Sequence, residues 1–95
     1  MTEIPRIKAS DLKRALKHSQ RQRIMRGELE AGDVAALRRF VGLTQQDFSQ
    51  ALGISVHTLR NWEQGRRYPE GPALALLRIA ARHPGIVREN LSTAA

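Results

Sequence analysis

The chain has 95 residues, of which 41% are hydrophobic and 26% are charged, and its formal net charge is +7 at pH 7. A chain of this length forms one small domain with a compact core built from local elements, which excludes a two-domain enzyme. The absence of cysteine excludes disulfides, thiolate catalysis and cysteine-ligated zinc.

Residues 1–32 are predicted to form a basic, partly helical arm, because they carry eight Lys or Arg against four Asp or Glu. A helix is expected over residues 10–26 with Ser10 as its N-cap, because apolar side chains in the first part of this segment repeat at helical spacing. The apolar pattern then fades, so this helix is expected to fray or to order on a partner. Residues 27–32 are expected to be a linker to a domain over residues 33–95.

The first helix of this domain is expected to be capped by Asp33 and ended by Gly42, which supplies a left-handed residue. The next helix opens at Thr44, whose hydroxyl can accept a hydrogen bond from an amide near Asp47. Gly53 closes this second helix after about two turns.

Ser55 is expected to start a third helix, with Gly65 as its stop, and Pro72 suits the first turn of a fourth. A last short turn is expected after the break at Pro84 and Gly85. No convincing run of residues alternates as a strand does, so the predicted fold class is all-α, with five short helices in the domain and a helical arm before it. The predicted core consists of Leu37, Phe40, Val41, Leu43, Phe48, Leu52, Ile54, Val56, Leu59, Trp62, Leu74, Leu77 and Ile79.

The second and third helices, joined by residues 53–55, have the dimensions of a helix-turn-helix. Glycine permits the tight turn, which lets the first helix brace the second. The second helix of such a unit enters the major groove of DNA with its N-terminal part foremost. The exposed residues near its start are Val56, His57, Arg60 and Asn61.

The stretch over residues 37–84 resembles the Xre/Cro-type helix-turn-helix family, whose members have the compact lambda-repressor-like fold. Within that family, residues 59–84 resemble the HigA-like antitoxins of bacterial type II toxin–antitoxin pairs. The match covers roughly residues 34–87 and leaves the first 32 residues outside. It rests on the spacing of Gln45, Ala51, Leu52, Gly53, Ser55, Leu59, Trp62, Glu63, Gly65 and Pro69.

The resemblance implies contacts with the phosphates of DNA. Thr44 and Gln45 match family positions at the N-terminus of the bracing helix that hold a phosphate, where free N–H groups and the helix dipole favour an anion. Arg66 and Arg67 follow the recognition helix and are expected beside backbone phosphates, where they add affinity without sequence preference.

The resemblance also implies that His57, Arg60 and Asn61 face base edges, and Val56 can meet a thymine methyl group. Arginine can pair bidentately with guanine and asparagine with adenine. Trp62 lies on the side of Leu59 at helical spacing and is expected in the core instead of stacking on a base.

Arg38 and Glu63 match a pair that forms a structural ion pair in many family members. This pair is expected to tie the first helix of the domain to the third. Removing one partner of a largely buried pair leaves the other charge uncompensated, so the pair is expected to matter for stability.

The net positive charge predicts a polyanionic partner. The resemblance implies a homodimer on double-stranded operator DNA that represses transcription, with the apolar C-terminal helices as the expected dimer surface. It further implies an antitoxin that neutralises a RelE- or HigB-like toxin and autoregulates their operon. Two alternatives stay open: a stand-alone or phage-type regulator without a toxin, and a protein-interaction module that has lost DNA binding. The arm can be a solvated segment, a toxin contact or a further DNA contact.

No catalytic residue, metal site or cofactor is predicted, and an enzyme is the weakest of the possibilities. The three histidines, His18, His57 and His83, are too far apart in sequence to form a local ligand pair. No apolar run approaches the roughly 20 residues that span a bilayer, and the N-terminus lacks the apolar stretch of a secretory signal. The protein is therefore expected in the cytoplasm, away from membranes.

Overall fold

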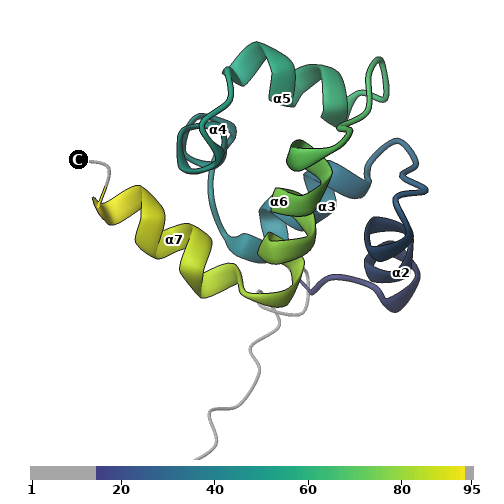
Figure 1. Cartoon of the computed structure of the whole chain (residues 1–95), viewed down its shortest axis with the longest axis horizontal. Helices are drawn as coiled ribbons and strands as arrows, with labels where there is room; N and C mark the ends of the chain where they lie inside the picture. The colour runs from purple at the N-terminus through teal and green to yellow at the C-terminus, as the bar shows by residue number, and fades with distance from the viewer. Residues whose placement is uncertain (1–14, 94–95) are drawn as a thin grey trace, which may run out of the picture.

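The computed structural model describes residues 15–93, which form six α-helices and, within that range, no strand (Figure 1). The all-helical prediction is confirmed, but the predicted five helices become six, because the arm helix is part of the same compact unit. The helices are α2 (His18–Arg26), α3 (Asp33–Val41), α4 (Gln45–Leu52), α5 (Val56–Glu63), α6 (Pro72–Arg82) and α7 (Pro84–Thr93).

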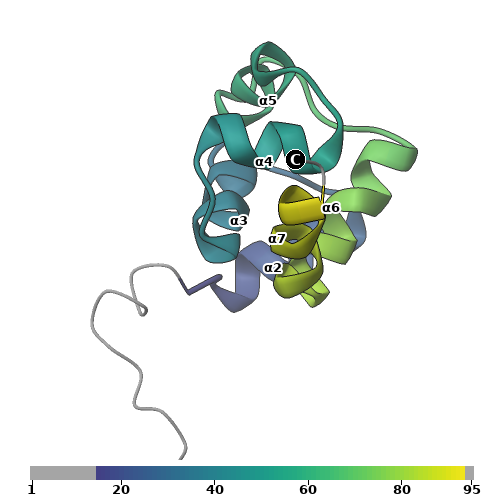
Figure 2. The ribbon, with the colours of Figure 1, turned by 90° about the vertical axis from the view of Figure 1, so that its left-hand side faces the viewer.

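Helix α3 lies in the middle of the molecule and packs against α2, α5, α6 and α7. Figures 1 and 2 show α5 at one end of the molecule, with α4 beside it and α2 toward the other end. This arrangement leaves one long side of α5 without a neighbouring helix in either view. No helix among the described residues is long and apolar enough to cross a membrane.

The ends of α4 and α5 follow from local chemistry, as the sequence predicts. The Thr44 hydroxyl accepts a hydrogen bond from the backbone N–H of Asp47 at 3.1 Å, and the Ser55 hydroxyl accepts one from Thr58 at 3.0 Å. Gly53 ends α4 with a φ of 73°, a left-handed conformation that glycine adopts at little cost. Residues 53–55 therefore form the tight turn between the two helices.

The predicted start of the first helix and the predicted length of the last one are wrong, whereas the first helix ends at Arg26 as predicted. Helix α2 begins at His18 instead of near residue 10, and residues 15–17 are not helical. Its start is fixed by Gln20, whose side chain accepts a hydrogen bond from the backbone N–H of Lys17 at 3.0 Å. The predicted cap at Ser10 lies outside the described residues. At the other end, Pro84 opens a ten-residue helix where a short turn was expected.

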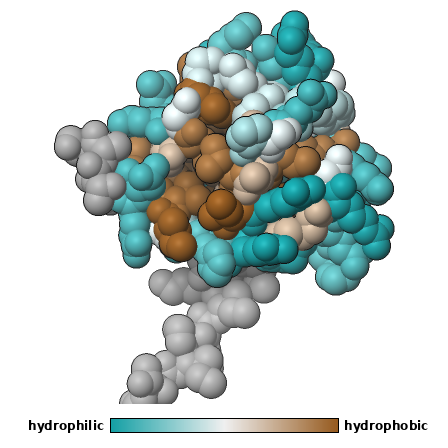
Figure 3. Space-filling view, viewed as in Figure 1, coloured by the Kyte–Doolittle hydropathy of each residue, from teal (hydrophilic) through white to brown (hydrophobic). Residues whose placement is uncertain are grey.

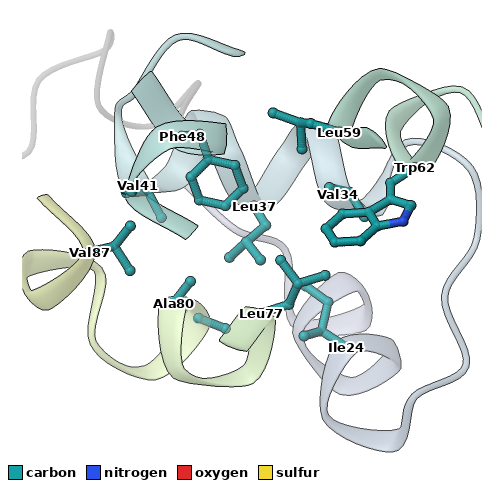
Figure 4. Close-up of a cluster of buried hydrophobic side chains, with 12 residues drawn as sticks. Ile24, Val34, Leu37, Val41, Phe48, Leu59, Trp62, Leu77, Ala80 and Val87 are labelled. Carbon is teal, nitrogen blue, oxygen red and sulfur yellow. The ribbon is translucent and has the colours of Figure 1, made fainter. Parts of the chain in front are cut away.

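The core combines side chains from α2 to α7, and Figure 4 shows ten of them labelled. Six members of the predicted core are fully buried or nearly so. Ile79 is a wrong prediction, because it is 45% exposed: Leu77 and Ala80 take the buried side of α6, and Ile79 lies about 200° around the helix from Leu77. Ile24 was missed, although it is fully buried. The buried apolar residues are Ile24, Val34, Leu37, Val41, Phe48, Ala51, Leu59, Trp62, Leu77, Ala80, Ala81 and Val87.

Polar contacts also fasten α2 to the rest of the molecule. Arg23 donates two hydrogen bonds of 2.8 Å to the carboxylate of Asp33, which also accepts one from the backbone N–H of Glu30. Arg21 donates to the carbonyl of Ala81 in α6 at 2.7 Å. Asp33 was expected to cap α3, but Gly32 is the N-cap residue and the Asp33 side chain faces Arg23 instead. Residues 18–26 are thus part of the compact unit.

The buried carboxylate of Asp33 makes this contact sensitive to pH. Burial alone would raise the pKa of Asp33, but the hydrogen bonds from Arg23 and Glu30 and the charge of Arg23 outweigh it, so the pKa lies below its ordinary value of 3.8. A carboxyl whose pKa is lower in the folded state adds stability above its ordinary pKa and loses it as the pH falls through the folded value.

We expect Asp33→Asn to destabilise the protein most near neutral pH and less under acidic conditions. The measurement is the free energy of unfolding in urea for both proteins, from about pH 7 to about pH 2. The difference between wild type and variant should shrink as the pH falls below 3.8. A difference that stays constant over this range would contradict the assignment.

Candidate nucleic-acid interface

Helix α5 is held by two apolar side chains and presents its polar edge outward. Leu59 is fully buried and Trp62 is 6% exposed, and Figure 4 shows both side chains directed into the core. Trp62 therefore packs in the core, as predicted. His57 and Arg60 are exposed on the same helix, and Val56 and Asn61 are partly exposed. The four residues predicted to contact bases lie together on a helix whose other side is fixed.

Two of these residues contact each other. The Asn61 amide nitrogen lies 3.3 Å from the Nε2 atom of His57, one helical turn earlier. Residues four apart on a helix are neighbours, so the contact needs no distortion of α5. It joins two polar side chains into one surface over the middle of the helix.

Of the residues predicted to contact phosphates, Thr44 precedes α5 in the chain, and Arg66 and Arg67 follow it. Thr44 is exposed at the start of α4, and Arg66 and Arg67 are exposed in the turn after α5. The backbone N–H groups of both arginines approach the carbonyl of Asn61, at 3.0 and 3.4 Å, so this turn folds back against the end of α5. The backbone of both residues therefore stays close to the end of the helix that they follow.

The start of α4 offers backbone donors of its own. The first N–H groups of a helix have no partner within the helix, and their dipoles favour an anion. The Thr44 hydroxyl accepts a hydrogen bond from the N–H of Asp47, and the Thr44 carbonyl accepts one from the N–H of Phe48. The N–H groups of Gln45 and Gln46 are left at the tip of the helix.

A hollow of about 300 Å³ lies beside this helix start and was not foreseen from the sequence. Its most exposed cation is Arg39, which sequence reasoning missed because its neighbour Arg38 carried the recognised motif. A cation beside a helix N-terminus adds to the attraction for an anion. The hollow is lined by Arg38, Arg39, Gly42, Leu43 and Thr44.

The structure brings Arg38 and Glu63 together as an ion pair. Arg38 donates to the two carboxylate oxygens of Glu63 at 2.8 and 3.2 Å, and to the carbonyl of Leu43 at 3.2 Å. The side chains are 17% and 8% exposed, respectively. The pair joins the middle of α3 to the end of α5 and lies beneath the polar edge of α5.

The side chain of Gln45 does not point freely toward solvent. Its amide nitrogen donates to Glu63 at 3.2 Å, and its amide oxygen accepts from the Nε atom of Arg60 at 3.3 Å. Sequence reasoning assigned Gln45 to phosphate and did not foresee these contacts, because they join residues 15 and 18 positions apart. The predicted phosphate and base contacts of all these residues stay predictions.

Between residues 15 and 93, no three His, Cys, Asp or Glu side chains come together in a group that could hold a metal ion.

Comparison with known proteins gives one family and several relatives. A family model described as a helix-turn-helix domain matches residues 11–91. Antitoxin HigA-2 of Vibrio cholerae serotype O1 is 38% identical over 60 residues, which is 61% of this chain and 58% of that protein. No solved structure matches with comparable significance.

Two uncharacterized HTH-type transcriptional regulators are also similar. YiaG of Escherichia coli (strain K12) is 32% identical over 57 residues, 60% of this chain and 59% of that protein. YazB of Bacillus subtilis (strain 168) is 42% identical over 45 residues, 47% of this chain and 65% of that protein. The matches thus span less than two thirds of each relative's own length.

Proposed function

Because the chain belongs to the helix-turn-helix domain family, we propose that it is a sequence-specific DNA-binding transcriptional repressor that reads operator DNA with α5. The observation that carries this proposal is that α5 has one buried apolar side and one exposed polar side. Leu59 and Trp62 fix one side in the core, while His57 and Arg60 are exposed on the helix. A helix held in this way can enter a major groove without giving up its place in the fold.

In the proposed complex, the exposed side of α5 between Val56 and Asn61 contacts base edges. Arg60 pairs with guanine, Asn61 with adenine, and Val56 meets a thymine methyl group. His57 adds a hydrogen bond to a base from the same surface. These contacts supply sequence preference.

Phosphate contacts fix the position of the protein on the duplex. Arg66 and Arg67, which follow α5, bind phosphates of one DNA strand. The backbone N–H groups at the tip of α4 bind another phosphate together with Thr44. The charge of +7 favours this association with a polyanion.

The repressor is proposed to act as a homodimer. Two recognition helices then reach successive major grooves roughly 34 Å apart. The apolar side chains exposed on α6 and α7 support a dimer surface in this part: Leu76 is 38% exposed, Ile79 45% and Ile86 54%. Figure 3 shows apolar residues gathered on the face where α4, α6 and α7 meet.

We also propose that the protein is the antitoxin of a type II toxin–antitoxin pair, neutralising a RelE- or HigB-like toxin and autoregulating the operon. The similarity to a protein named antitoxin HigA-2 supports this finer assignment. The similarity to HTH-type regulators YiaG and YazB favours the second candidate, a stand-alone regulator without a toxin.

DNA binding is tested by selection of duplexes from a pool with a randomised core of about 20 base pairs, using the full chain as bait. The proposal expects enrichment of one related set of sequences, and two half-sites about 10 base pairs apart if the dimer is correct. Failure to enrich any sequence would leave only the interaction module that has lost DNA binding.

Co-purification separates the antitoxin from the stand-alone regulator. The tagged full chain is expressed in its native host, and proteins bound to it are identified by mass spectrometry. A small basic ribonuclease in stoichiometric amount, inactive until released from the complex, is the result expected for an antitoxin. A chain that purifies without such a partner, from cells that produce it at normal levels, supports the stand-alone regulator.

A further inference from the structure

The contacts of Gln45 form a chain of hydrogen bonds from the core to the exposed surface of α5. Arg38 pairs with Glu63, Glu63 accepts from the Gln45 amide nitrogen, and the Gln45 amide oxygen accepts from Arg60. The side chains of Arg38 and Glu63 are largely buried, whereas Arg60 is exposed. Gln45 therefore connects the ion pair to the long, exposed side chain of Arg60.

The orientation of the Gln45 amide follows from its two neighbours. A carboxylate only accepts hydrogen bonds and a guanidinium only donates them. The amide must then turn its nitrogen to Glu63 and its oxygen to Arg60, because the opposite orientation would place like partners together at both ends. Glu63 itself is fixed by two hydrogen bonds from Arg38. The position of the acceptor offered to Arg60 is thus set by the core.

This acceptor selects which edge of the Arg60 guanidinium remains available. The contact occupies the Nε atom of Arg60, so the outer edge formed by the two terminal nitrogens is left for a ligand. That edge carries two parallel N–H donors, the pattern that matches O6 and N7 of guanine. A side chain held in this way loses less conformational freedom on binding than an unrestrained arginine.

We propose that Gln45 is a positioning residue that holds Arg60 for end-on, bidentate recognition of a guanine in the major groove. The inference rests on the proposed function. It replaces the phosphate contact predicted for the Gln45 side chain, and leaves phosphate to the backbone donors at the start of α4. Gln45 then contributes to sequence preference without touching a base.

The test uses the duplex that the wild-type chain enriches from the randomised pool, and versions of it with each base pair replaced in turn. Dissociation constants are measured for the full-length wild type, Gln45→Met, Arg60→Ala and the double variant. Methionine keeps the length of the glutamine side chain but lacks its hydrogen-bonding groups. Gln50→Met is the matched control, because Gln50 is an exposed glutamine on the same helix. Thermal unfolding of each variant reports on the fold.

Arg60→Ala is expected to abolish the preference for guanine at one base pair, which identifies the pair that Arg60 reads. Gln45→Met should weaken the preference at that same pair by about fivefold, the effect expected for loss of one ordinary hydrogen bond, and leave preferences at other pairs unchanged. In the double variant, Gln45→Met should have no further effect on this pair. Gln50→Met should leave every preference intact.

A uniform loss of affinity for all duplexes in Gln45→Met, with the guanine preference retained, would overturn the proposal in favour of a phosphate contact. Additive effects in the double variant would overturn it as well. If the wild type enriches sequences but Arg60→Ala affects no guanine, this inference fails together with the base contact proposed for Arg60, and sequence-specific binding by the chain stands. If the wild type enriches no sequence, the proposed function fails and the inference falls with it.

Discussion

Replacing Glu63 with alanine is expected to lower the melting temperature by about 15 °C. Arg38 is 17% exposed and would keep its charge without its carboxylate partner. Removing one partner of a buried ion pair lowers the free energy of unfolding by about 3–5 kcal/mol. Because Arg38 is partly exposed, we expect a loss near the lower end of this range. In a domain of this size, each kcal/mol shifts the melting temperature by about 4–8 °C. Thermal unfolding followed by circular dichroism measures the shift.

The matched control is Glu70→Ala, which removes the same atoms from an exposed position in the turn before α6. Glu70 makes no ion pair with the residues of the described range 15–93, and the expected change in melting temperature is within about 2 °C. Equal melting temperatures for the two variants would show that the Arg38–Glu63 pair does not support the fold.

Arg60→Ala and Arg66→Ala are expected to impair DNA binding in different ways. Loss of a bidentate contact to guanine removes about 1–3 kcal/mol of discrimination at one base pair and leaves affinity for unrelated duplexes nearly intact. Loss of a phosphate contact weakens binding to all duplexes alike. It also makes the slope of log K against log salt less steep by about 0.9 for each contact removed.

The distinction is measured by titrating both variants with the selected duplex and an unrelated duplex at several salt concentrations. Arg66→Ala should show the reduced slope with both duplexes, and Arg60→Ala should lose mainly its preference for the selected one. The assignments would be wrong if Arg66→Ala changed base preference, or if Arg60→Ala weakened both duplexes to the same extent.

Much of the fold could be predicted because its signals are local. The hydroxyls of Thr44 and Ser55 and the left-handed glycine at residue 53 each act within four residues of the helix end they define. The apolar spacing of Leu59 and Trp62 likewise fixes which side of α5 is buried. These features suffice to locate the helix-turn-helix.

Other features depend on which residues the fold brings together. Ile24 is fully buried although it stands in a mostly polar stretch, because α2 packs on α6 and α3. Arg23 and Asp33 pair across a loop whose path the sequence does not define. Similarly, Gln45 could be predicted at the start of α4, but its contacts with Glu63 and Arg60 depend on how α4 crosses α5.

The dependence of duplex binding on salt tests the central claim most directly. Fluorescence anisotropy of a labelled, selected duplex gives the association constant of the full chain between about 50 and 200 mM salt. If the two α5 helices of a dimer place about six phosphates against cations and backbone donors, log K should fall with log salt at a slope near −5. A flat response, or no binding at the lowest salt, would contradict DNA recognition by this helix.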